Sequence, residues 1–238
     1  MYNLIAVLHL NFLGKMMVDL FDIVEDLNKW ESGKAVIVRG AGETFCSGGD
    51  LQVMKGLVKE SDGGTLMCDF MQHTLTSLFQ SRLLSVALIE GYAVGGGAEI
   101  ATACDFRLAT SNAKIGFVHS RMGLTPGWGG ASRLVRIVGR TGALRLLASA
   151  AVLDAQDAMD IKLVDGIVST ESAITECTSW LSTLINCEPV VAHALKRVVV
   201  GAIDSDLTSS LHIEGQIFAT LFGGEAQQNA HKRQLKHR

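Results

Sequence analysis

The chain has 238 residues, of which 48% are hydrophobic and 19% charged, and its formal net charge is −3. This length and apolar content suffice for one large domain, or for a domain with a helical appendage. The nearly balanced charge argues against a nucleic-acid partner, and no apolar run is long enough to predict a membrane span. Five cysteines without CxxC or Cys/His ligand spacing fit a reduced compartment, so we expect a cytoplasmic protein without a metal centre.

Strands and helices alternate along the first two thirds of the chain. Apolar runs predict strands over 5–10, 35–38, 84–89, 106–109, 114–117 and 166–168. Helical spacing of apolar residues predicts helices over 15–30, 51–57, 67–79, 131–138, 143–149, 155–161, 173–185, 189–199 and 209–222, with another starting near residue 96. This order favours an α/β fold with a mostly parallel sheet.

Two glycine-rich stretches each follow a predicted strand and lead into a predicted helix. They are TFCSGGDL at 44–51 and GYAVGGGAE at 91–99. Glycine permits sharp turns and leaves backbone N–H groups open to a ligand. Two such turns at the ends of neighbouring strands can direct two N–H donors at one oxygen, which is the arrangement of an oxyanion hole.

Five blocks in one order carry a resemblance to a known family. They are FCSGGDL at 45–51, GGGAEIA at 95–101, ACD at 103–105, KIGF at 114–117 and PGWGG at 126–130. The chain resembles the crotonase, or enoyl-CoA hydratase/isomerase, superfamily. The resemblance implies a crotonase-like spiral of ββα turns with the acyl-CoA site at 1–141. It also implies a helical C-terminal region at 142–238 that assembles the protein into a homotrimer or hexamer.

The resemblance assigns the oxyanion hole to the N–H groups of Gly49 and Gly96. Gly96 also lies near a predicted helix N-terminus, where free N–H groups and the helix dipole favour negative charge. Glu99 has two interpretations: a partner of that dipole, or a catalytic acid/base that matches the first of two glutamates in hydratases. Trp128, flanked by glycines, is expected to form a flat wall of the substrate site. The other substrate-binding residues are expected in the two turns: Phe45, Ser47, Gly48, Leu51 and Gly95.

The position of the second hydratase glutamate is occupied by His119. Hydration uses two carboxylates on one water, whereas an imidazole can donate a proton near neutral pH or, as a cation, bind a substrate carboxylate. An imidazole at this position suits a substrate with a free carboxylate next to its thioester. Together with the resemblance, it leads us to expect decarboxylation of a short branched malonyl-type acyl-CoA, ethylmalonyl-CoA or methylmalonyl-CoA, through an enolate. The resemblance implies no cofactor, since coenzyme A is part of the substrate.

Two alternatives stay open. One is an enoyl-CoA hydratase or isomerase that relies on Glu99. The other is a catalytically weak binding or scaffold protein, because the segment at 11–17, which helps to bind CoA in the family, is shorter here.

Four further side chains have structural interpretations. We expect Cys46 to be a small buried side chain, and Asp105 to accept a hydrogen bond from a backbone N–H or from the neighbouring Arg107. Arg121 and Arg133 are expected at the solvated surface.

Overall fold

Two β-sheets form the centre of the fold, and the first is entirely parallel. The computed structural model describes residues 5–10, 16–49, 55–203 and 205–236. The larger sheet has the order β1-β2-β3-β5-β8, built from β1 (Ile5–Leu10), β2 (Ala35–Gly40), β3 (Leu84–Ile89), β5 (Phe106–Thr110) and β8 (Gly166–Val168). The smaller sheet joins β4 (Tyr92–Val94) in parallel to β6 (Lys114–Gly116), which pairs antiparallel with β7 (Val152–Asp154). The predicted α/β class with a mostly parallel sheet is confirmed.

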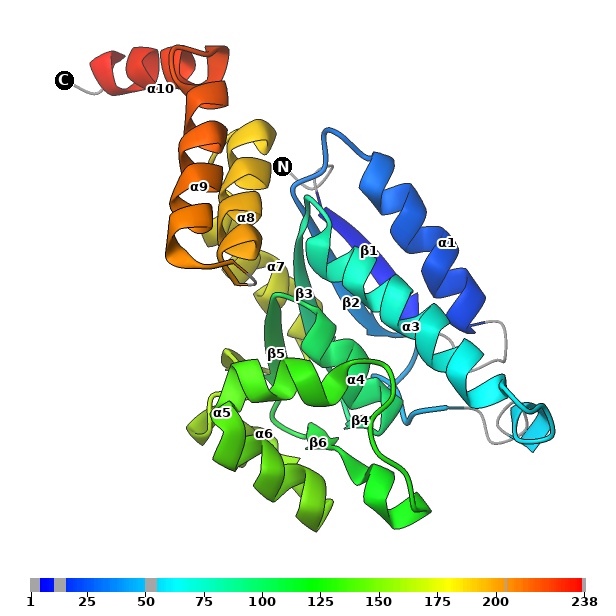
Figure 1. Ribbon diagram of the computed structural model, residues 1–238. Helices are drawn as coiled ribbons and strands as arrows, with labels where there is room; N and C mark the ends of the chain where they lie inside the picture. Colours follow the sequence, from blue (N-terminus) through cyan, green and yellow to red (C-terminus); the bar gives the residue numbers. More distant parts are fainter. Residues whose placement is uncertain (1–4, 11–15, 50–54, 204, 237–238) are drawn as a thin grey trace.

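Helices cover both faces of the larger sheet. Successive side chains of a strand point to opposite faces, so Val36 and Val38 pack in one buried cluster and Ile37 in another. The first cluster takes in α1 (Met16–Lys29) and α3 (Gly63–Gln80), which lie side by side over the sheet (Figure 1). The second cluster packs against α7 (Ala173–Leu184).

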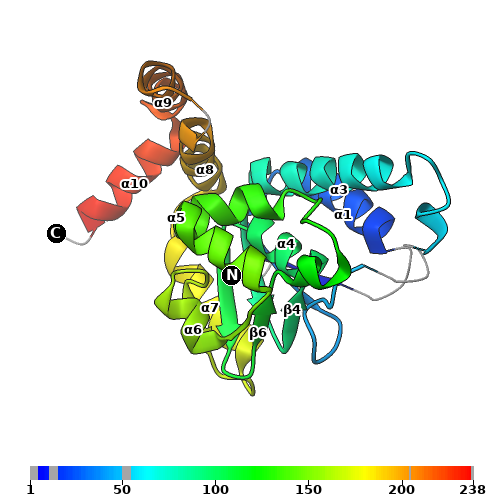
Figure 2. The ribbon, with the colours of Figure 1, turned by 60° about the horizontal axis from the view of Figure 1, so that its bottom comes forward.

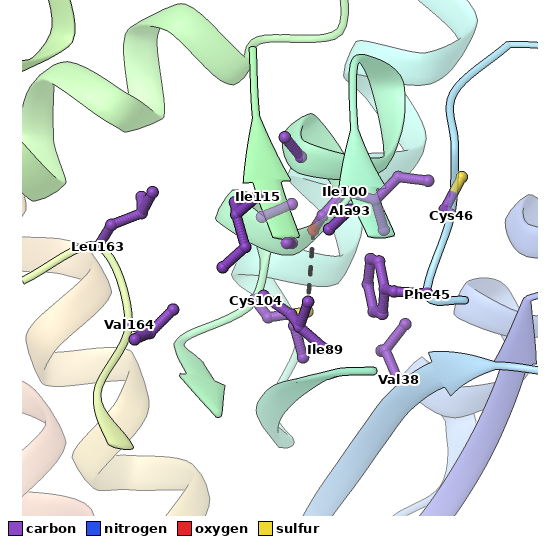
Figure 3. Close-up of a cluster of buried hydrophobic side chains, with 14 of the residues drawn as sticks. Val38, Phe45, Cys46, Ile89, Ala93, Ile100, Cys104, Ile115, Leu163 and Val164 are labelled. Carbon is purple, nitrogen blue, oxygen red and sulfur yellow. Dashed lines mark hydrogen bonds between the residues drawn. The ribbon is translucent and has the colours of Figure 1, made fainter. Parts of the chain in front are cut away.

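The first cluster continues between the two sheets, below the two glycine turns. Figure 3 shows Phe45 beside Val38 and Ile89, with Ile100 and Ile115 on the neighbouring elements. The short helix α4 (Gly96–Ala103) is buried along its whole length and contacts β4 and α5 (Gly130–Ser149) (Figure 2). It is therefore fixed from all sides, which makes its N-terminus a rigid place for a binding site.

Three C-terminal helices extend away from the sheets. These are α8 (Pro189–Ile203), α9 (Leu207–Leu221) and α10 (Glu225–Lys236), and α8 and α9 lie side by side (Figure 1). Helices α8 and α9 and the residue that follows α9 expose large apolar side chains: Val190, Leu195, Val199, Ile203, Leu207, Leu211, Phe218 and Phe222. Among the described residues, no helix is long and apolar enough to cross a membrane.

Several predicted boundaries were wrong. Helix α3 starts one turn earlier than predicted, at Gly63, because the Asp-Gly-Gly sequence begins the helix instead of forming a loop. The helices predicted over 131–138 and 143–149 form the single α5, with a non-helical residue, Gly139, between them. Among the short strands β4 and β7 and the helices α6 (Ala155–Asp160) and α10, only α6 was predicted. The expected division of the chain between 1–141 and 142–238 falls inside helix α5. Strands β7 and β8, which follow that point in the sequence, pair with β6 and β5, which precede it.

An ion pair with a buried lysine ties α8 to the larger sheet. Asp105 accepts hydrogen bonds from the Ser85 N–H (2.7 Å) and from Lys196 Nζ (2.7 Å), so the predicted backbone partner is confirmed. Arg107 pairs instead with Asp165, at 3.2 Å. Because Lys196 belongs to α8 and its side chain is only 3% exposed, this contact anchors α8 on the sheet.

Candidate active site

The two glycine turns lie directly against each other. Cys46 forms an isolated parallel bridge with Ala93, in which the Val94 N–H donates to the Cys46 carbonyl at 3.0 Å. A Cβ atom on Gly48, whose φ is +105°, would lie only 3.5 Å from the Gly96 nitrogen. The first turn therefore stands at the N-terminus of α4, and the positive φ at Gly48 is a backbone conformation that favours glycine.

Helix α4 presents its free backbone donors at this junction. Gly96 is its first residue, so the Gly96 N–H has no acceptor one turn back in the helix. Gly95 precedes it with φ +57°, a left-handed conformation that favours glycine. The helix dipole adds partial positive charge at the same place. Gly49 lies exposed in the facing turn.

The other predicted substrate-binding residues differ in their accessibility. Ser47 is exposed, Gly48 is buried and Gly95 is half-buried. Phe45 is completely buried, and its ring points into the core, so it anchors the first turn from below (Figure 3). Leu51 lies outside the described residues, as do Asp50 and most of the segment at 11–17.

Trp128 packs on the start of α4. A Cβ atom on Gly96 would lie 2.3 Å from Cζ3 of the Trp128 ring, so the ring fills the space that a side chain at 96 would need. Trp128 is itself buried. Its ring therefore supports the Gly96 N–H from behind.

Glu99 is buried in the first turn of α4, with a side chain only 2% exposed. Its Oε1 atom accepts hydrogen bonds from the backbone N–H groups of Trp128 (2.8 Å) and Gly130 (3.0 Å). A Cβ on Gly130 would lie 2.4 Å from the Glu99 Cγ, so only glycine lets this backbone come so close. Two backbone N–H donors and the positive end of the helix dipole thus meet at this carboxyl group.

His119 meets the other oxygen of this carboxylate. It lies in the 3-10 helix η2 (Val118–Met122), and its Nε2 atom is 3.0 Å from Glu99 Oε2. The imidazole is 13% exposed, and its Nδ1 atom is buried without a hydrogen-bond partner among the described residues. The two residues that the sequence singled out for proton chemistry are thus in contact.

The loop at 127–130 is held by groups that the sequence analysis missed. Arg133 donates to the Trp128 carbonyl at 2.9 Å, and Gln72, on α3, donates to the Gly127 carbonyl at 2.8 Å. The expectation that Arg133 lies at the solvated surface was wrong: burial lowers its pKa, and the charge of Glu99 counteracts part of that effect. Arg121 is exposed, as expected, and its guanidinium reaches the Ala150 carbonyl.

Two further features of the site are its potential metal ligands and the thiol of Cys46. In the part of the chain that the structure describes, no three His, Cys, Asp or Glu side chains gather closely enough to bind a metal ion. Cys46 is buried, as predicted, and burial raises the pKa of its thiol. A thiol in that state is a poor nucleophile at neutral pH.

The parallel sheet, the paired glycine turns and the buried glutamate at a helix N-terminus define an enzyme of the crotonase type. The chain belongs to the enoyl-CoA hydratase/isomerase family, whose model matches residues 9–236.

Two similar proteins carry the name of the same enzyme. This chain is 45% identical over 228 residues to the ethylmalonyl-CoA decarboxylase of Gallus gallus, and the match covers 94% of this chain and 76% of that protein. It is 43% identical over 222 residues to the ethylmalonyl-CoA decarboxylase of Homo sapiens, covering 92% and 72%. A crystal structure of an enoyl-CoA hydratase from Bacillus anthracis superposes with a TM-score of 0.88 at 26% identity, over 94% of this chain and 86% of that one. The resemblance inferred from the sequence blocks is confirmed.

Proposed function

We propose that this protein decarboxylates a short branched malonyl-type acyl-CoA, with ethylmalonyl-CoA and methylmalonyl-CoA as the candidate substrates. The observation that carries the proposal is the contact between Glu99 and His119 at the start of α4. The names of the relatives at 43–45% identity agree with it. A hydratase needs two carboxylates that share one water, and here one of the two partners is an imidazole.

In this proposal the site works by stabilising an enolate. When the bond between the α-carbon and the carboxylate breaks, its electron pair stays on the α-carbon and delocalises to the thioester oxygen, while CO₂ leaves. The N–H groups of Gly49 and Gly96 hold that oxygen, where the partial charge of the α4 N-terminus adds to their effect. The α-carbon then takes a proton, which completes the acyl-CoA product. These steps require no cofactor besides the CoA of the substrate.

A paired assay tests the proposal. Initial rates are measured with ethylmalonyl-CoA, following butyryl-CoA and CO₂, and with crotonyl-CoA, following hydration. We expect turnover of ethylmalonyl-CoA to exceed that of crotonyl-CoA. Faster hydration would favour an enoyl-CoA hydratase that uses Glu99. Binding of CoA esters without turnover of either would favour the scaffold alternative.

We also propose that the protein works in the cytoplasm as a homotrimer or hexamer. The apolar side chains exposed on α8 and α9 support assembly, since Leu195, Val199 and Phe218 are each about 60% exposed in the single chain. Sizing at micromolar protein with light scattering should give a trimer or a multiple of it. A monomer at that concentration contradicts the proposed assembly without bearing on the chemistry.

A further inference from the structure

The hydrogen bond between Glu99 and His119 fixes where the imidazole carries its proton. An ionised carboxylate only accepts hydrogen bonds, so the His119 Nε2 atom, 3.0 Å from Glu99 Oε2, must be the donor. The Oε1 atom is already engaged by the Trp128 and Gly130 N–H groups, so the carboxylate cannot turn away. The neutral imidazole is therefore the Nε2–H tautomer.

This arrangement leaves Nδ1 as the nitrogen that can exchange a proton. Nδ1 is buried, and it has no hydrogen-bond partner among the described residues. A buried polar atom without a partner is rare in folded proteins, and a catalytic role is one of the reasons for which such an atom is kept. Glu99 ties this imidazole to the same helical turn that begins with the Gly96 N–H.

We infer that Glu99 is a positioning residue, and that His119 Nδ1 is the atom that protonates the enolate. The assignment of the proton acceptor rests on the proposed decarboxylation, whereas the tautomer does not. The imidazolium carries protons on both nitrogens; Nδ1–H transfers its proton to the α-carbon, a new C–H bond forms, and the neutral Nε2–H imidazole remains. The proton is then replaced from water. Glu99 neither gains nor loses a proton in this step.

The tautomer can be measured without any substrate. In protein labelled with ¹⁵N-histidine, protonated and bare ring nitrogens resonate in separate ranges, and the signals of His119 are identified by their loss in His119→Gln. At mildly alkaline pH, where imidazoles are neutral, we expect a proton on Nε2 of His119. In Glu99→Gln the amide can keep both backbone bonds and donate to Nε2, so the proton should move to Nδ1.

His193 serves as an internal control for this measurement. Its Nε2 atom lies 2.6 Å from the Gly33 carbonyl, which can only accept, so it must also be the Nε2–H tautomer. Its signals should not change in Glu99→Gln. A wild-type His119 with its proton on Nδ1 would overturn the inference. This result is read from the wild-type protein, so it does not depend on whether Glu99→Gln folds.

Kinetics test the role assigned to Glu99. Glu99→Gln should lower kcat about a hundredfold or more with little change in KM, because an imidazole whose Nε2 accepts a hydrogen bond from the amide cannot readily become the imidazolium that donates the Nδ1 proton. Added to His119→Ala, it should cause little further loss, since a positioning residue acts only through its partner. An additional loss of similar size in the double variant would show that Glu99 acts directly. If no variant or wild-type protein decarboxylates, the proposed function fails, while the tautomer result still stands.

Discussion

Replacing Gly96 by alanine is expected to lower both the stability of the fold and the activity that depends on the proposed oxyanion hole. The added Cβ would lie 2.3, 2.6 and 3.0 Å from three atoms of the Trp128 ring. Carbon atoms in contact are separated by about 3.5–4.0 Å, so the ring or the start of α4 must move by more than about 1 Å. Neither can move freely, because Trp128 is buried and its backbone N–H is bonded to Glu99.

The size of the effect follows from this overlap. Overpacking a tight core typically costs about 1–3 kcal/mol. For a chain of this size, that loss lowers the melting temperature by about 2–12 °C, at about 2–4 °C per kcal/mol. A shift of the Gly96 N–H also weakens one of the two proposed oxyanion donors, and loss of one donor costs about 10²–10³ in kcat. Calorimetry and steady-state rates on ethylmalonyl-CoA measure the two effects.

A matched control and a rescue make this prediction specific. Gly42→Ala adds the same methyl group where no atom lies within 4 Å, so its stability and activity should stay near wild type. Trp128→Phe removes the ring atoms nearest to Gly96, so adding it to Gly96→Ala should restore part of the lost stability. If Gly96→Ala behaves like Gly42→Ala, the reasoning about the Trp128 ring and the donor is refuted.

Three other changes test separate parts of the structure. His119→Glu rebuilds a pair of carboxylates with Glu99, so decarboxylation should fall by about 10²–10⁴ and crotonyl-CoA hydration should rise; unchanged decarboxylation would contradict the role of the imidazole. Lys196→Met removes the cation that pairs with the partly buried Asp105 and should cost about 3–5 kcal/mol in urea denaturation. Lys29→Met, at an exposed pair, should leave the urea midpoint nearly unchanged, and equal losses in the two variants would refute the argument. Burial raises the pKa of Cys104 from 9.0 to about 12, so the folded thiol stays protonated while the unfolded thiol ionises, and stability falls as pH rises from 9 to 12. Cys104→Ser should flatten this fall in denaturation curves recorded across that range, and an unchanged slope would contradict it.

The sequence was sufficient for the elements whose patterns are local. Strand β3 and helix α4 begin where the apolar run and the glycine turn predicted, because a buried strand and a helix start each depend on adjacent residues. The strands β4 and β7 have three residues each, too few for a periodic pattern, and they are stabilised by pairing with β6 from elsewhere in the chain. Helix α10 was missed because the composition of its polar residues is equally typical of a solvated chain end.

The contact partners in the site could not be predicted from the sequence, because they too come from distant parts of the chain. The chemistry of Glu99 and His119 was predicted from residue types and from the family resemblance. The backbone donors at Trp128 and Gly130 are about 30 residues from Glu99, and a backbone N–H leaves no trace in the residue type. The glycine at 130 was the one available signal, since a side chain there would strike the Glu99 Cγ. The burial of Arg133 follows from its bond to the same loop, which no local pattern encodes.

Main-chain groups and one side chain have separate proposed roles in this site. The proposed anion donors and the donors that hold Glu99 are all main-chain N–H groups, which most substitutions leave in place. Residue 119, by contrast, is one side chain on a five-residue 3-10 helix, outside both sheets. Exchanging that side chain would alter the proposed proton donor and leave the proposed enolate-binding N–H groups in place. Selection of variants at position 119 alone, screened against a panel of acyl-CoA thioesters, is therefore the shortest route to new activities of this protein.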